Sequence, residues 1–268
     1  MTGSAGRYPP EFDRQFWSGA LVPLARALLR VGYFKLEVEG AEHLPRSGPV
    51  VYAQNHAGWF PLDAFFLALA VSDALGPQAA PVFAAYDRAV TAPVLGPFLR
   101  RAGAVPASWF RRPEHLPPEV RAVGIFPEGW PGNTKPFWEA YRMKPWNRGF
   151  VRVAAALDAP IVPVAVIGGE ECLPVAWTVG LLKPLLGAAV GLPLSLLPLP
   201  ARWKIVFHRP VRVEEGRAAL TDHDGAQALS ARIRGTVQAT LDRESRERAL
   251  GKLSHGVAAL AGTGARSS

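Results

Sequence analysis

A histidine and an aspartate lie seven positions apart in the segment QNHAGWFPLD, which runs from Gln54 to Asp63. A carboxylate that holds one imidazole nitrogen fixes the tautomer and makes the other nitrogen a better general base. On a continuous helix His56 and Asp63 would be about 10.5 Å apart, too far for a hydrogen bond. Gly58 and Pro61 interrupt such a helix, so the segment can fold back. The segment therefore predicts a His56–Asp63 dyad; a helix-capping Asp63 and a structural His56 are the alternatives.

A second candidate group lies in the segment GIFPEG, which ends at Gly129. Glycine and proline shape a turn there, and such a turn offers backbone N–H groups and a carboxylate to a polar ligand. Pro127, Glu128 and Gly129 are therefore candidate substrate-binding residues. An ordinary turn with an exposed acid is the alternative.

Basic and aromatic residues alternate in the segment KPFWEAYRMKPWNRGFVRVA, from Lys135 to Ala154. This pattern suits a phosphate-bearing substrate or lipid headgroups, and it also occurs where proteins bind single-stranded nucleic acid. No nucleic-acid-binding motif accompanies it, so we expect no nucleic-acid partner. Lys135 and the upstream Arg111 are candidate substrate-binding residues; a solvated basic face is the alternative.

The elements that must position these residues are short apolar runs that alternate with helical stretches. This alternation predicts a single α/β domain with a central, mostly parallel or mixed sheet covered by helices. His56 and Glu128 would then both follow strands at the carboxyl edge of the sheet, where ligands bind in open α/β folds. Pro163, inside one strand, predicts a bulge or an edge position. We predict strands at 34–39, 50–54, 82–85, 123–126, 161–166 and 204–207, and helices at 63–71, 92–101, 148–157 and 226–243.

Composition narrows the class of protein. The chain has 268 residues, a formal net charge of +8 and 49% hydrophobic residues, which excludes intrinsic disorder. A single cysteine, Cys172, excludes a disulfide framework and a thiolate zinc site, and the histidines show no metal-ligand spacing, so we expect no metal. We also expect no cofactor. The chain contains no G-x-S-x-G motif, which disfavours a serine hydrolase. Cys172 is predicted to be a buried thiol, and the neighbouring Glu170 and Glu171 to be exposed in a loop.

Two segments are predicted to contact a membrane. Residues 16–31 place leucines at helical spacing opposite Arg26 and Arg30, which is typical of an interfacial amphipathic helix; a helix packed on the core is the alternative. Residues 173–200 are apolar but broken by prolines, so they suit an interface better than a span. The first residues lack the pattern of a signal peptide. These features predict a peripheral protein on the cytoplasmic face of the cell membrane.

Four segments, in order along the chain, resemble the sequence blocks of the glycerolipid acyltransferase superfamily, which includes the lysophospholipid acyltransferases. NHAGWFPLD resembles the His–Asp block, LGPFLRRAGAVPAS the second block, FPEG the third and IVPV the fourth. The resemblance covers about 34–210. The usual family spacing is His-x4-Asp, but here Pro61 stands at that place and the acid follows at Asp63, as in a bacterial subgroup with His-x6-Asp spacing.

The resemblance implies a reaction. His56 would take a proton from an acceptor hydroxyl that attacks an acyl thioester, and Asp63 would orient His56. The implied donor is acyl-CoA or acyl carrier protein, both acidic, and the implied acceptor is a (lyso)glycerolipid, whose polar head Glu128 and Gly129 would hold. Members that acylate lysophosphatidate carry an arginine after the glycine of the second block. This chain has AVPASWF there, so either Arg111 takes that role or the acceptor lacks a phosphomonoester.

The predicted organisation is an interfacial segment at 1–33, an acyltransferase domain at 34–250 and a flexible tail at 251–268. Two other functions stay open on the sequence alone. The same His–Asp pair could hydrolyse a lipid or thioester with water, or the chain could be a non-enzymatic basic protein that binds membranes.

Overall fold

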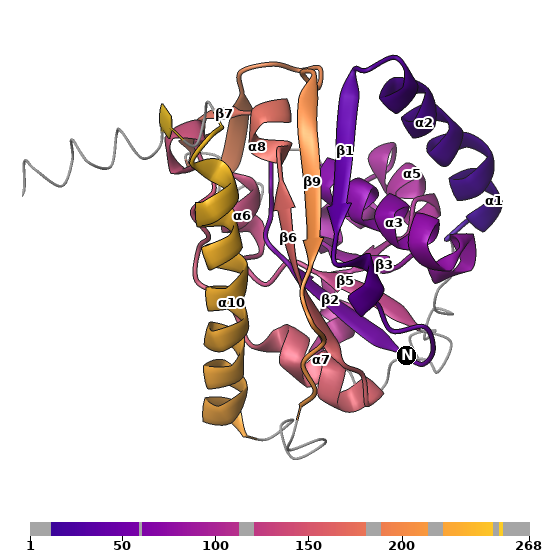
Figure 1. Ribbon diagram of the computed structural model, residues 1–268, viewed down its shortest axis with the longest axis vertical. Coiled ribbons are helices and arrows are strands. Elements are labelled where there is room, and N and C mark those ends of the chain that lie inside the picture. Colours follow the sequence, from indigo (N-terminus) through magenta and orange to yellow (C-terminus); the bar gives the residue numbers. More distant parts are fainter. Residues whose placement is uncertain are drawn as a thin grey trace, which may run out of the picture.

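A seven-stranded sheet in the order β1-β9-β6-β2-β5-β3-β4 forms the centre of the computed structural model (Figure 1). The model describes residues 12–58, 61–112, 121–180, 189–213, 222–248 and 252–253. Neighbouring strands are parallel, except for the antiparallel pair β6 and β9. This confirms the predicted α/β domain with a mostly parallel sheet. The strands are β1 (Phe34–Glu39), β2 (Val50–Gln54), β3 (Val82–Ala85), β4 (Ala104–Pro106), β5 (Ala122–Ile125), β6 (Ile161–Ile167) and β9 (Ala201–Phe207).

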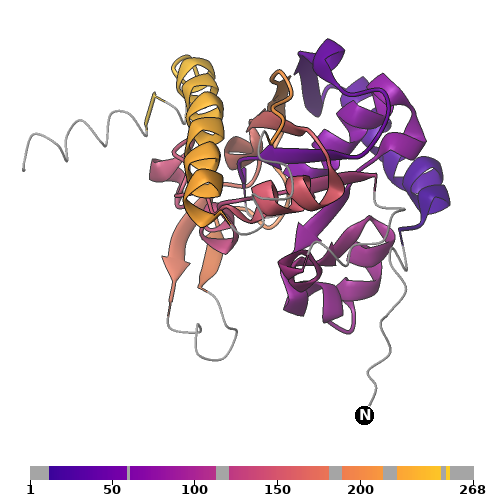
Figure 2. The same ribbon diagram turned by 90° about the horizontal axis from the view of Figure 1, so that it is seen from below.

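Helices cover both faces of this sheet. The long helix α10 lies on one side, and α2 and α3 lie on the other, in both views (Figures 1 and 2). Helix α7 joins α10 on its side, where both contribute to one apolar cluster. The helices are α1 (Arg14–Phe16), α2 (Val22–Arg30), α3 (Leu62–Leu75), α4 (Asp87–Thr91), α5 (Leu95–Arg101), α6 (Trp130–Asn133), α7 (Gly149–Leu157), α8 (Gly169–Cys172) and α10 (His223–Ser245), with 3-10 turns η2 (Ala41–His43), η3 (Pro77–Ala79), η4 (Ala107–Arg111) and η6 (Phe137–Glu139).

The central strands are apolar on both faces because helices cover both. Every residue of β2 and of β6 is buried, as is usual for parallel strands inside an α/β sheet. Pro163 of β6 faces an irregularity in the pairing: three positions separate Ile161 from Val164, whereas four separate their partners Phe207 and Val211. An extra residue therefore lies opposite the proline. The extra residue lies in the segment between Phe207 and Val211, whereas β6 itself pairs in register with β2 through Pro163. The predicted bulge in β6 is therefore not confirmed, and the alternative edge position is wrong because β6 lies between β2 and β9.

The parallel arrangement decides where the loops meet. β2 lies between β5 and β6 and runs parallel to both. The segments that follow these three strands therefore gather at one edge of the sheet. They carry His56 after β2, Glu128 after β5 and Glu170 after β6.

The N-terminal helix differs from the uninterrupted helix that the sequence suggests. A π-helical turn, η1 (Trp17–Leu21), separates α1 from α2. Trp17 and Ala25 are buried against the α3 side of the sheet, whereas Leu24 is 60% exposed. Arg26 forms an ion pair with Asp73 of α3 at 2.8 Å. The segment thus packs on the core with one side and leaves apolar side chains exposed on another.

The apolar segment predicted at 173–200 begins with a small antiparallel sheet of β7 (Val175–Val179) and β8 (Val190–Pro193). Its residues 181–188 lie outside the described part of the chain, as do residues 1–11 of the predicted interfacial segment and nearly all of the predicted tail. Within the described part, no helix combines the length and the hydrophobicity needed to cross a membrane.

Candidate active site

His56 and Asp63 meet, as their spacing predicted. His56 lies on the loop after β2, Asp63 lies in the first turn of α3, and His56 Nδ1 is 2.6 Å from Asp63 Oδ2. The backbone N–H groups of Ala57 and Ala64 also donate to the carboxylate, at 2.9 and 2.7 Å. The side chain of Asp63 is fully buried. Because the carboxylate accepts all three bonds, Nδ1 carries a proton and Nε2 of the neutral ring is the basic nitrogen.

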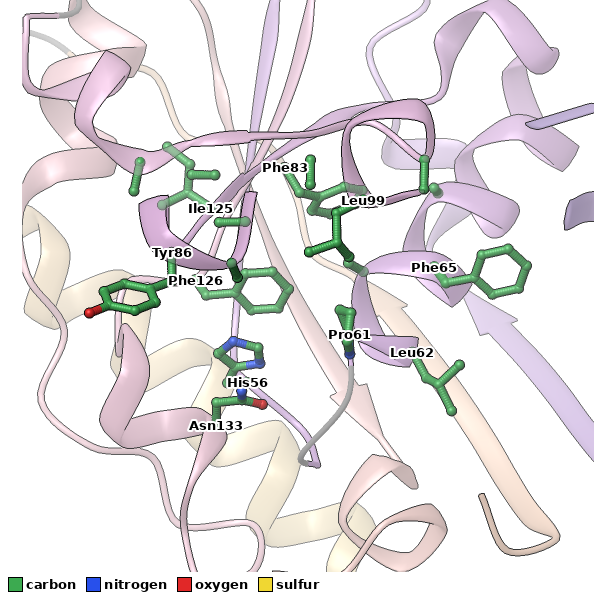
Figure 3. Close-up of a pocket in the computed structure, with 18 of the residues that line it drawn as sticks. His56, Pro61, Leu62, Phe65, Phe83, Tyr86, Leu99, Ile125, Phe126 and Asn133 are labelled. Carbon is green, nitrogen blue, oxygen red and sulfur yellow. The ribbon is translucent and has the colours of Figure 1, made fainter. Parts of the chain in front are cut away.

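The imidazole of His56 is held in place by stacking as well. Its ring lies 4.0 Å from the ring of Phe126, centroid to centroid, with 15° between the planes (Figure 3). The His56 side chain is 14% exposed and lines a cavity. No group in the described residues hydrogen-bonds to Nε2, so this nitrogen can accept a proton from a bound molecule.

The cavity beside His56 has a volume of about 1130 Å³. It runs from the carboxyl edge of the sheet to the N-terminal helix, and apolar side chains make up most of its wall (Figure 3). The volume of the cavity exceeds the roughly 300–1,000 Å³ of most small-molecule sites. Residues from several helices and strands contribute, among them Leu21, Leu24, Leu28, Phe34, Phe65, Ala68, Phe83, Phe98, Leu99, Ile125 and Phe126.

Glu128 is not available to an acceptor in the way that the sequence predicted. Its side chain is buried, and both oxygens accept bonds from the protein: Oε1 from the His56 N–H at 2.9 Å and Oε2 from the Lys144 N–H at 2.7 Å. Glu128 does not line the cavity. Its carboxylate binds the backbone of the histidine loop instead, which corrects the predicted contact with a polar head.

Lys135 is buried in the same way. Its ammonium nitrogen lies 3.1 Å from Glu170 Oε1 and 3.7 Å from Glu128 Oε2, and its side chain is 2% exposed. Burial lowers the pKa of Lys135, but the carboxylates of Glu128 and Glu170 more than reverse this, so the net shift is upward. Lys135 therefore stays charged inside the protein, and it does not line the cavity. The predicted direct contact between Lys135 and a substrate is corrected accordingly.

The acids after β6 also differ from the prediction of an exposed loop. Glu170 is buried beside Lys135, and its burial raises its pKa. Glu171 is partly buried and forms an ion pair with Arg248 at 2.9 Å. Cys172 is buried as predicted, and this burial raises the pKa of its thiol to about 12, which makes it a poor nucleophile at neutral pH.

The remaining predicted residues divide into two groups. Gly129 and Arg111 line the cavity, whereas Pro127 does not. The Pro127 carbonyl accepts hydrogen bonds from the N–H and the side chain of Asn147, so it fixes that loop. Gly129 has φ +61° and ψ −155°, a conformation that is essentially confined to glycine.

The structure adds two arginines to the cavity wall, Arg88 of α4 and Arg152 of α7. Arg152 belongs to the basic and aromatic segment that the sequence marked, but nothing in that pattern distinguished it from its neighbours. The described part of the chain holds no cluster of three or more His, Cys, Asp or Glu side chains arranged for a metal ion.

Comparisons with known proteins identify the family of the chain. Residues 35–167 match the family model described as Acyltransferase. The chain is 34% identical over 245 residues to an uncharacterized protein of Mycobacterium tuberculosis. The aligned region covers 87% of this chain and 67% of that protein. A second uncharacterized protein, from Mycobacterium leprae, is 33% identical over 245 residues, which covers 87% of this chain and 66% of that protein.

A solved structure shares the fold. The 1-acyl-sn-glycerophosphate (LPA) acyltransferase PlsC from Thermotoga maritima superposes with a TM-score of 0.57 at 14% sequence identity, covering 88% of this chain and 82% of that one. The family match spans the histidine loop, the Glu128 turn and β6, and the shared fold places them on the same kind of sheet. The chain therefore belongs to the acyltransferase family, within the glycerolipid acyltransferase superfamily that its sequence blocks resemble.

Proposed function

We propose that this protein transfers a fatty acyl group from a thioester to a hydroxyl of a (lyso)glycerolipid. The main support for this proposal is the position of His56. Its imidazole contacts the Asp63 carboxylate and borders a large apolar cavity. Acyl transfer needs a base for the hydroxyl and an apolar space for the acyl chain, and the two adjoin here.

In the proposed reaction, His56 Nε2 accepts the proton of the acceptor hydroxyl as its oxygen attacks the thioester carbonyl. The tetrahedral intermediate collapses, the C–S bond breaks, and the imidazolium returns the proton to the departing thiolate. Asp63 stabilises the imidazolium between these steps. The products are an ester and a free thiol, and no covalent bond to the protein forms.

The cavity supports a fatty acyl chain because each buried CH₂ contributes about 0.8 kcal/mol of transfer free energy. For the donor we propose acyl-CoA or acyl carrier protein, whose negative charge suits the net charge of +8 and the arginines at the cavity, Arg88, Arg111 and Arg152. The reaction needs no further cofactor. A lysophospholipid acceptor is supported by the Thermotoga protein that shares this fold, which is a 1-acyl-sn-glycerophosphate acyltransferase.

We also propose that the protein works at a membrane surface, as a peripheral protein on the cytoplasmic face. Exposed apolar side chains support this: Leu24 and Val31 at α2, Val94, Leu95 and Phe98 around α5, and Leu194, Leu196 and Leu197 after β8. The hydroxyl of Tyr33 donates to the Pro198 carbonyl at 2.6 Å, which joins the end of α2 to the segment after β8. Flotation with anionic liposomes tests this, and a protein that stays at the bottom of the gradient contradicts it.

Incubation of the purified protein with labelled acyl-CoA and a panel of lysophospholipids and monoacylglycerols tests the reaction. We expect an acylated acceptor from the wild type and none from His56→Ala, with both proteins folded by circular dichroism. Free fatty acid without an acylated acceptor would support a hydrolase that uses the same pair. Liposome binding without turnover of any donor, acyl carrier protein included, would support a non-enzymatic membrane protein.

A further inference from the structure

A cluster of three buried charges lies behind the loop that carries His56. Lys135 occupies its centre, with its ammonium nitrogen 3.1 Å from Glu170 Oε1 and 3.7 Å from Glu128 Oε2. Each of the three residues is at most 5% exposed. The three come from different places in the chain: the turn after β5, the segment after α6 and the start of α8.

The cluster is connected to the proposed base through the backbone. Glu128 Oε1 accepts the hydrogen bond of the His56 N–H at 2.9 Å. Gly132 fits between the two residues so closely that a Cβ atom there would lie 2.6 Å from Glu128 Cβ and 3.0 Å from His56 Cβ. Because Gly132 packs tightly against both residues, we expect a shift of the Glu128 side chain to displace His56.

Electrostatics require a cation at this place. Two buried carboxylates, Glu128 and Glu170, repel each other and lose their hydration, and an ammonium between them offsets both penalties. Glu170 has a second anchor, since its Oε1 accepts the Tyr141 N–H at 3.0 Å. Without Lys135, the buried Glu128 carboxylate would lose its counter-ion, whether or not Glu170 is charged, and would gain by turning towards solvent or by taking up a proton.

We propose that Lys135 is a positioning residue for the His56 base: its buried ammonium holds the Glu128 carboxylate where it accepts the His56 N–H. His56 then has two fixed points, its backbone through Glu128 and its ring through Asp63. A displacement of the base by about 1 Å costs on the order of 100-fold in rate. The role rests on the proposed acyl transfer, but the geometry of His56 can be measured without it.

The test is Lys135→Met, which keeps the length of the side chain and removes the charge. We expect kcat for acyl transfer to fall at least tenfold, while KM for the donor and for the acceptor changes less than twofold. Lys204→Met is the matched control, because Lys204 also lies between two glutamates, Glu39 and Glu244, at 3.0 and 2.9 Å, and does not line the cavity. Its activity is expected to stay within twofold of the wild type.

Two further variants separate positioning from stability. Lys135→Met/Glu170→Gln removes one buried charge of each sign, so we expect it to recover thermal stability and not kcat. If Lys135→Met alone does not fold, kcat is measured on this double variant instead. In Lys135→Met/Glu128→Gln we expect no further loss beyond the larger single effect, because Lys135 acts through Glu128. The proposal would be overturned if the losses in kcat of the two single variants multiply in Lys135→Met/Glu128→Gln. Full kcat in Lys135→Met/Glu170→Gln would overturn it as well.

The ¹⁵N NMR signals of the His56 imidazole provide a readout that needs no turnover. We expect the His56 signals to shift in Lys135→Met and to keep their wild-type positions in Lys204→Met. Unchanged signals in Lys135→Met overturn the positioning role. A wild type that acylates no acceptor contradicts the proposed function and leaves the NMR result to decide the positioning role by itself.

Discussion

The side-chain amide of Asn55 pairs with the backbone of Val166 as a further strand residue would. Its Nδ2 donates to the Val166 carbonyl at 2.9 Å, and its Oδ1 accepts the Val166 N–H at 2.8 Å. Asn55 directly precedes His56 and is fully buried. The pairing between β2 and β6 is thereby extended by one side chain, and the histidine loop leaves the sheet from a fixed point.

Asn55→Ala should destabilise the protein and reduce activity together. It leaves the N–H and the carbonyl of Val166 buried without these partners, and unpaired buried groups cost about 1–3 kcal/mol each. We expect a loss of about 2–4 kcal/mol in the free energy of unfolding, measured by urea denaturation. Thr236→Ala, which removes an exposed hydroxyl from α10, should change it by less than about 0.5 kcal/mol. Equal stability in both variants would contradict the role of Asn55.

Asp63→Asn should lower kcat by about 10²–10⁴-fold, because an amide stabilises neither the correct tautomer nor the imidazolium. Steady-state acyl transfer measures this. Asp73→Asn is the matched control, since Asp73 lies on the same helix, forms an exposed ion pair with Arg26 and does not line the cavity. Full activity in Asp63→Asn would show that this carboxylate is not the partner of the base.

Alanine at Gly129 and at Gly235 should change stability in opposite directions. A Cβ has room at both positions, since it meets only Pro131 Cδ at 4.0 Å at the first and nothing within 4 Å at the second. Gly129 has a backbone conformation that alanine adopts at a cost of about 1–3 kcal/mol. Gly235 lies inside α10, where alanine stabilises by about 0.5–1 kcal/mol. Thermal unfolding of both variants checks this, and a stabilised Gly129→Ala would contradict it.

Ala68→Leu should shift acyl preference towards shorter chains. Ala68 lines the cavity on α3, about 7.5 Å beyond Asp63 along the helix axis. Excluding two CH₂ groups of a bound chain removes about 1.6 kcal/mol, which is roughly a 15-fold loss in kcat/KM for long donors. A series of acyl-CoA lengths measures this. Ala231→Leu, on the exposed side of α10, should leave the profile unchanged, and an unshifted profile in Ala68→Leu would place the chain elsewhere.

Cys172 should resist thiol reagents in the folded protein. Burial raises its pKa to about 12, from about 8.5 in an unfolded chain. Above pH 8.5 the folded state therefore binds more protons than the unfolded state, and the contribution of Cys172 to stability falls as pH rises towards 12, by at most about 1.4 kcal/mol per unit. Labelling with a chromogenic disulfide at pH 8 should be slow without urea and fast in urea. Rapid labelling of the folded protein would contradict this.

Much of the fold could be predicted because local patterns agree with the tertiary structure. The predicted ranges of β1, β2 and β3 coincide with the observed ones. β2 and β3 are short runs of largely apolar residues, and β1 alternates apolar with charged residues. The meeting of His56 and Asp63 followed from Gly58 and Pro61, which break the helix between them. β4 escaped prediction because it has only three residues and ends in a proline.

The charge cluster could not be predicted, for a physical reason. Whether a glutamate is buried depends on whether a cation lies beside it, and the partner of Glu170 is Lys135, far away in the sequence. Glu128 and Lys135 have the residue types of a substrate site, so the sequence suggested ligand contacts. Only the fold shows that these two charges neutralise each other inside the protein.

The topology of the sheet also governs the order of folding during synthesis. β1 is an edge strand whose neighbour in the sheet is β9, with Phe34 opposite Ala201. The N-terminal helix that walls the cavity is thus made first, but β1 gains its neighbour only when the chain beyond β9 has left the ribosome. At about 5–20 residues per second this delay is on the order of ten seconds. During that time the sheet that this helix packs against is incomplete, so the apolar side of the helix stays exposed on the nascent chain.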